Sequence, residues 1–124
     1  LNFLGQVSSA DEQIARASLD RVDALHLSDR YIAEISGGEQ QRVVIGRALL
    51  NDPDIILADE PTGNLDPETS EGILKLLTDI SKTGRAVIFA THNYTLLKKF
   101  TAKTIKCEDG KLIEVNDDEE IELL

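Results

Sequence analysis

The sequence predicts an α/β fold with parallel strands, because segments with helical spacing alternate along the chain with short apolar runs. Two observations carry this prediction. The runs at 54–58 and 86–90 have the length and β-branched content of strands buried in a parallel sheet. Helical segments precede and follow the first run, and turn residues separate each element from the next.

The first half of the chain is expected to contain two helices. Ser9 and Glu12 have the spacing of a capping box, which begins a helix over about 10–26. Residues 28–36 are expected to form a loop, and a second helix follows over 39–50.

The second half is expected to contain a third helix, a short fourth helix and a hairpin. Asp66 caps the third helix, Pro67 occupies its first position, and Gly84 ends it. The strand at 86–90 is followed by a short helix over 94–100. Asp109-Gly110 is a strong hairpin turn signal. The strands of this hairpin are expected at 104–107 and 111–115.

Composition limits the classes of function. The chain has 124 residues, and its formal net charge of −10 disfavours nonspecific binding to nucleic acid or to anionic lipid. No apolar run approaches the roughly 18 residues that a membrane-spanning helix needs. The one cysteine, Cys107, excludes an intrachain disulfide and favours a reducing compartment. The chain lacks methionine and begins at Leu1, so we expect that it was cut from a longer one.

A candidate phosphate site lies at Ser36-Gly37-Gly38. Two glycines directly before a helix let backbone amides approach an anion, and the helix N-terminus adds partial positive charge. Taken alone this signal is weak, because a glycine pair in a loop is more often an ordinary turn.

Charged and titratable side chains follow both apolar runs. Asp59 and Glu60 stand where the first run ends, a place where carboxylates can bind Mg²⁺ or deprotonate a water. His92 follows the second run and could contact a phosphate. The alternatives are a solvated strand end for the carboxylates and a structural or exposed histidine.

The order and spacing of these features resemble the C-terminal half of an ABC ATPase nucleotide-binding domain. The stretch from Ser36 to Arg42 resembles the ABC signature, with Ile35 where the family usually has leucine. Asp59-Glu60 looks like the Walker B pair, Gly63-Asn64-Leu65-Asp66 like the D-loop, and His92 like the switch histidine. Four motifs in order at the family's spacing make the resemblance specific.

The resemblance implies a role for each residue. Two such domains would sandwich two ATP molecules head to tail, and Ser36-Gly37-Gly38 would grip the γ-phosphate of the ATP held by the second ABC ATPase subunit. Asp59 would bind Mg²⁺ through water, and Glu60 would be the general base. His92 would contact the γ-phosphate, and Asp66 would link the two sites across the dimer interface.

Roles within the signature helix stay open. The resemblance assigns Leu65 to packing and leaves Gln40 and Arg42 without a fixed role.

The family's Walker A motif, G-x-x-x-x-G-K-[ST], is missing from this sequence. Gly110-Lys111 comes nearest, but it continues with Leu112. The resemblance therefore implies a partial P-loop NTPase sheet with flanking helices that lacks the Walker A strand and leaves an apolar edge along 86–90. By itself the chain is expected to be inactive and not to bind ATP usefully.

The resemblance also implies a domain division. Residues 1–37 would end the helical signature subdomain, 38–116 would form the C-terminal part of the ATPase core, and 117–124 would be an acidic tail.

The sequence of residues 58–66 is similar to that of the branch that contains cell-division, lipoprotein-release and macrolide-efflux ATPases, and residues 90–94 look closest to the FtsE type. The branch implies an integral membrane partner, FtsX-like or a permease, no nucleic acid, and a cytoplasmic place on the inner face of a bacterial cell membrane. The alternatives are a soluble ABC ATPase of the ribosome or chromosome, and an inert interaction module. Glu60 and His92 disfavour the inert module.

Overall fold

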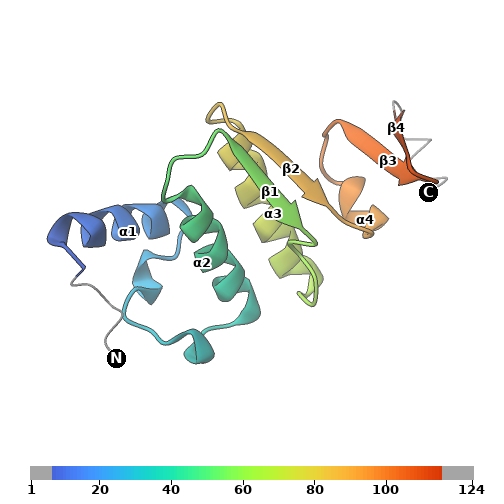
Figure 1. Ribbon diagram of the computed structural model, residues 1–124. Helices are drawn as coiled ribbons and strands as arrows, with labels where there is room; N and C mark the ends of the chain where they lie inside the picture. Colours follow the sequence, from blue (N-terminus) through green and yellow to red (C-terminus); the bar gives the residue numbers. More distant parts are fainter. Residues whose placement is uncertain (1–6, 116–124) are drawn as a thin grey trace. The chain divides into compact units, whose positions relative to one another are not determined.

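A computed structural model describes residues 7–115, which form two compact units divided between Phe89 and Ala90. The first unit contains, in chain order, α1 (Ser9–Arg21), the 3-10 turns η1 (Leu25–Leu27) and η2 (Ile32–Glu34), α2 (Gly37–Leu49), β1 (Ile55–Asp59), α3 (Pro67–Ser81) and β2 (Ala86–Ala90) (Figure 1). The last residue of β2, Ala90, is the first residue of the second unit. Their order confirms the predicted α/β pattern. The expected acidic tail at 117–124 lies outside the described residues.

Helix α1 begins one residue earlier than the expected cap implied. Ser8 is the N-cap: its Oγ accepts from the Asp11 amide at 3.1 Å, and the Asp11 carboxylate accepts from the Ser8 amide at 3.1 Å. The predicted capping box of Ser9 and Glu12 is therefore wrong, because Ser8 and Asp11, which have the same spacing one residue upstream, form the capping box instead. The helix ends at Arg21, since the chain turns at Asp23, whose φ of 56° lies in the left-handed region.

Helix α2 packs closely against the end of α1. Gly46 makes this approach possible, because a Cβ there would lie 3.1 Å from Val22 Cγ2 and 3.3 Å from the Ser18 carbonyl oxygen. Arg42 Nη1 donates to the Val22 carbonyl at 3.0 Å and ties the two helices together. Val22 is fully buried at this contact.

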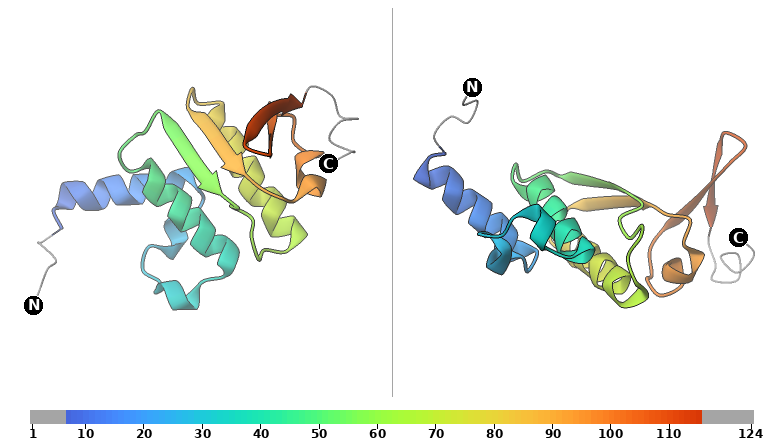
Figure 2. Two further views of the ribbon diagram at one scale, coloured as in Figure 1. Left: turned by 45° about the vertical axis from the view of Figure 1, so that its right-hand side comes forward. Right: turned by 90° about the horizontal axis from the view of Figure 1, so that it is seen from below.

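Strands β1 and β2 are neighbours that run in the same direction (Figure 1). Helices α2 and α3 lie on one face of the pair (Figure 2). The opposite face is exposed: Leu57 is 76% and Ile88 61% exposed, whereas Ile56 is 5% exposed. Among the described residues, the predicted burial of these strands therefore holds for one face only, because alternate side chains point away from the helices.

Arg85 holds together the turns that precede the two strands. Its Nε donates to the Pro53 carbonyl at 3.0 Å, its Nη1 donates to Thr83 Oγ1 at 3.0 Å, and its Nη2 pairs with the Asp52 carboxylate. The side chain is only 14% exposed. Directed, partly shielded bonds of this kind fix the start of β2 beside the start of β1.

Helix α3 has the predicted beginning. Asp66 is the N-cap and Pro67 the first helical residue. Its buried face is the predicted apolar one: Ile73, Leu74, Leu77 and Ile80. The helix ends at Ser81, and Gly84 follows with a φ of 96° that suits glycine.

The second unit contains α4 (Tyr94–Leu97) and the antiparallel hairpin of β3 (Thr104–Glu108) and β4 (Lys111–Val115). Asp109 and Gly110 have φ of 49° and 73°, which confirms the predicted turn, because a tight two-residue hairpin needs positive φ at both positions. Within residues 7–115, no helix has the length and apolarity to cross a membrane.

Candidate functional site

The N-terminus of α2 carries the first group of candidate residues. Ser36 is the N-cap: its Oγ accepts from the Glu39 amide at 3.3 Å, and its amide donates to Glu39 Oε2 at 2.7 Å. The Gly37 and Gly38 amides belong to the first turn, where helices have no internal partner for N–H groups. This helix end can therefore bind an anion through backbone amides.

The carboxylate of Glu39 is held in its ionised form. The Ser36 amide, and after it the Ser36 hydroxyl, lower the pKa of Glu39, and the charges of His26 and Arg30 lower it slightly further. Gln40, whose role the sequence left open, donates from Nε2 to the carbonyls of Ile32 and Ile35 at 3.0 and 3.2 Å. It fixes the loop that leads into the helix.

The two glycines also have a packing role. A Cβ at Gly37 would lie 3.3 Å from Leu65 Cδ2, and a Cβ at Gly38 would overlap Thr69 Cγ2. The first turn of α2 thus lies directly against the residues around the start of α3. The contact of Leu65 agrees with the packing role expected for it.

Asp66 caps α3 with its own carboxylate. Oδ2 accepts from the Thr69 amide at 3.0 Å and Oδ1 from the Thr69 hydroxyl at 2.5 Å. The hydroxyl, followed by the amide, lowers the pKa of Asp66. Thr69 is not among the residues predicted from the sequence, although its place three residues after a cap is a signal that could have identified it.

Asp59 and Glu60 lie where β1 turns toward α3. Asp59 is the last residue of β1 and is exposed. Glu60 has a φ of 45°, a left-handed conformation that is uncommon for a residue with a side chain, and its carbonyl accepts from the Gly63 amide at 2.9 Å. Asn64 is also left-handed, with a φ of 62°. Two such residues within five positions make a compact turn between the carboxylates and Asp66.

The carboxylates suit one mode of Mg²⁺ binding. No group of three or more His, Cys, Asp or Glu side chains placed to hold a metal occurs among residues 7–115. Mg²⁺ commonly keeps several waters and uses one or two carboxylates together with substrate phosphates. Asp59, exposed at a strand end, fits that mode, and an all-protein cage does not fit.

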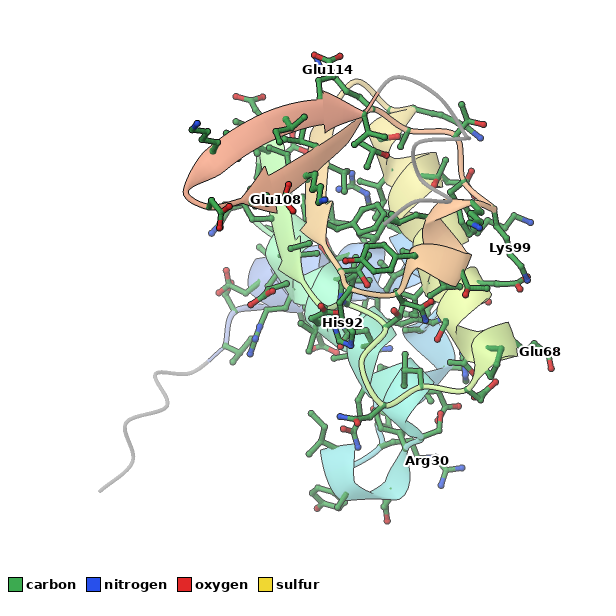
Figure 3. All side chains as sticks on the ribbon, turned by 90° about the vertical axis from the view of Figure 1, so that its right-hand side faces the viewer. Arg30, Glu68, His92, Lys99, Glu108 and Glu114 are labelled. Carbon is green, nitrogen blue, oxygen red and sulfur yellow. The ribbon has the colours of Figure 1, made fainter. Side chains whose placement is uncertain are left out.

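His92 belongs to the second unit. It is exposed and lies between β2 and α4 (Figure 3). The first unit thus contains Ser36, both glycines and Asp66 around one pair of helix ends, with Asp59 and Glu60 joined to Asp66 by the turn. Arg30 and Glu68 point away from the ribbon of that unit (Figure 3).

Comparison with known proteins identifies the family. Residues 2–63, half of the chain, match the model of the ABC transporter family. The chain is 40% identical to the cell division ATP-binding protein FtsE of Bacillus subtilis over 91% of this chain and 50% of that protein. It is 45% identical to FtsE of Escherichia coli over 77% of this chain and 43% of that protein. The chain therefore spans about half the length of the curated relatives it matches.

Solved structures agree with this assignment. An ATP-binding cassette of an ABC transporter in its ADP conformation superposes with a TM-score of 0.84 at 26% identity, over 98% of this chain and 48% of that one. A dimeric ATP-binding cassette in a post-hydrolysis state, bound to ADP and Pi, superposes with a TM-score of 0.61 at 35% identity, over 77% and 43%. The chain belongs to the ABC transporter family and carries part of its ATP-binding domain.

Proposed function

We propose that this chain supplies part of the ATP site of an ABC-type ATPase. The observation that carries the proposal is the N-terminus of α2, where a neutral hydroxyl cap and two glycine amides stand together. In the proposal, Ser36, Gly37 and Gly38 bind the γ-phosphate of an ATP molecule held mainly by a second copy. A helix N-terminus of this composition favours phosphate through both its amides and its dipole.

The proposed chemistry is water attack on that γ-phosphate. Glu60, the residue directly after β1, accepts the proton of the attacking water. Asp59 holds Mg²⁺ through water, and the cation supplies neutralisation of the phosphate charge. His92 contacts the γ-phosphate in this proposal, and Asp66 links the two sites of the dimer.

We further propose that the working protein is an FtsE-like subunit on the cytoplasmic face of a bacterial membrane. Relatives named FtsE at 40–45% identity support the branch, and the dimeric cassette structure supports pairing of two copies. The membrane partner would be FtsX-like or a permease. Residues 1–37 would belong to the helical subdomain and 38–116 to the ATPase core.

A chimaera tests this proposal. The half of Bacillus subtilis FtsE that the chain does not match is joined to this chain, and ATP hydrolysis and nucleotide-dependent dimerisation are measured together. We expect hydrolysis by the chimaera. Glu60→Gln should abolish turnover and leave ATP binding intact, because an amide cannot accept the proton.

Glu68→Gln is the matched control, because this carboxylate points away from the ribbon (Figure 3). It should leave turnover unchanged. Normal turnover in Glu60→Gln would contradict the role of Glu60. Cell-division rescue that depends on a membrane partner would distinguish the FtsE-like proposal from the soluble ABC ATPase alternative.

A further inference from the structure

We propose that Thr69 is a positioning residue that joins the N-terminus of α2 to the capping carboxylate of α3, so that the two move as one piece. Its methyl group lies against Gly38 and its hydroxyl holds Asp66. The joint is a property of this chain itself. Its consequence for ATP hydrolysis rests on the proposed function.

The methyl side of the joint is a contact without spare room. Gly38 is buried, and a Cβ built there would overlap Thr69 Cγ2 while lying 3.7 Å from Thr69 Cβ and 4.0 Å from Oγ1. The obstacle at this position is therefore the methyl group alone. Only hydrogen fits at position 38 while Thr69 keeps its present rotamer.

The hydroxyl side fixes that rotamer. Thr69 Oγ1 donates to Asp66 Oδ1 at 2.5 Å, while the Thr69 amide donates to Oδ2 at 3.0 Å. Threonine has few χ1 choices, because both of its branches sit on Cβ. Rotation that moves the methyl away from position 38 also moves the hydroxyl away from Asp66. A change at position 38 is thus transmitted to a carboxylate 28 positions further along the chain.

A second contact joins the first turn of α2 to the residues before α3. Gly37 faces Leu65, and a Cβ at position 37 would lie 3.3 Å from Leu65 Cδ2. Ser36, directly before the glycines, therefore cannot shift relative to the turn that ends at Asp66 without disturbing two packed positions. In the ATPase, the phosphate-binding end of α2 and the segment that begins at Glu60 would keep one alignment.

The direct test follows the Asp66 carboxyl by carbon-13 NMR titration in the 124-residue chain. Gly38→Ala should rotate Thr69, and the Asp66 titration midpoint should rise toward its ordinary value, because the hydroxyl is the largest cause of its lowered pKa. Thr69→Ser removes the methyl but keeps the hydroxyl, so the midpoint should stay low. The double variant Gly38→Ala/Thr69→Ser should restore the low midpoint.

Gly72→Ala is the matched control, because a Cβ there meets only Arg42 Nη2 at an ordinary 3.6 Å. It should leave the Asp66 titration unchanged. An unchanged midpoint in Gly38→Ala, or a double variant that stays raised, would overturn the proposal. If Gly38→Ala alone unfolds the chain, the double variant must fold. A double variant as unfolded as the single one also overturns the joint.

The chimaera then tests the consequence. Thr69→Val keeps a branch that can fill the methyl position and loses the hydroxyl. It should lower kcat about tenfold or more with KM for ATP little changed, since small misplacements of catalytic groups are costly, and Thr69→Ser should retain most activity. Full activity in Thr69→Val overturns the functional part. Absence of ATPase activity in the parent chimaera contradicts the proposed function, and the NMR result still decides the joint.

Discussion

Two helices of the first unit begin side by side, and their N-termini differ in what they can bind. The cap of α2 is the neutral hydroxyl of Ser36, followed by the Gly37 and Gly38 amides. The cap of α3 is the ionised Asp66, followed by Pro67, which has no N–H to offer. Both ends carry the same helix dipole. A neutral cap followed by glycine amides therefore suits a phosphate better than an ionised cap followed by proline.

Filling the α2 end should have the largest effect. In the chimaera, Ser36→Arg should abolish the ATP-dependent dimer and spare ATP binding by the single subunit, because the long side chain would occupy the space that we propose for the γ-phosphate of the ATP on the second copy. Size-exclusion chromatography with ATP measures the dimer.

Ser8→Arg provides the control for this change. Ser8 forms the same kind of capping box, with Asp11, at the start of α1. It should weaken that helix slightly and leave the dimer unaffected. Loss of the dimer in both variants would mean that cap removal, and not the position of Ser36, is responsible.

Local signals predicted the α3 end well. Asp66 as cap, Pro67 at the first position and the Asp109-Gly110 turn are all specified by neighbouring residues, so one sequence suffices to find them. The same kind of signal failed at α1, because Ser8 and Ser9 both have an acidic residue three positions later. Local sequence is compatible with both capping boxes and does not distinguish between them.

The contacts between the two helix ends could not be predicted. Gly38 was interpreted only as a source of amides, and its buried contact with Thr69 joins residues 31 positions apart. Nothing in either local sequence records that distance. The apolar runs alone do not show which face of β1 and β2 is exposed, for a related reason. Leu57 is as apolar as its buried neighbour Ile56, so the apolar run does not reveal that one face stays open.

Acid should weaken both helix ends. The pKa values of Glu39 and Asp66 are lowered by hydrogen bonds in the folded chain, so the unfolded chain binds more protons over the same pH range. Their stabilisation is present above the ordinary carboxyl range and is lost as pH falls through the folded pKa values. Asp11 at α1 adds a contribution of the same sign.

Urea unfolding at a series of pH values measures this loss. Glu39→Gln and Asp66→Asn should each reduce the acid dependence of the free energy of unfolding, because each removes one titrating carboxylate and keeps an oxygen that accepts. Their separate effects compare the two helix ends directly. A pH dependence that is identical in wild type and in Asp66→Asn would show that the α3 cap does not contribute.

The smallest expected effect is an increase in the free energy of unfolding. Gly72 lies inside α3, away from both helix ends, and its φ is not in the left-handed region. A Cβ there would lie 3.6 Å from Arg42 Nη2, which is an ordinary contact, so Arg42 can keep its bond to the Val22 carbonyl. Gly72→Ala should therefore stabilise the first unit by about 0.5–1 kcal/mol, the usual cost of glycine relative to alanine within a helix. With urea slopes of roughly 1–3 kcal/mol per molar, the urea midpoint should rise by a few tenths of a molar.

The same replacement at Gly37 should lower the urea midpoint, since Leu65 must move. If Gly72→Ala lowers the midpoint instead, the space around position 72 is tighter than the 3.6 Å contact implies, and the contrast between glycines at a helix end and glycines within a helix fails.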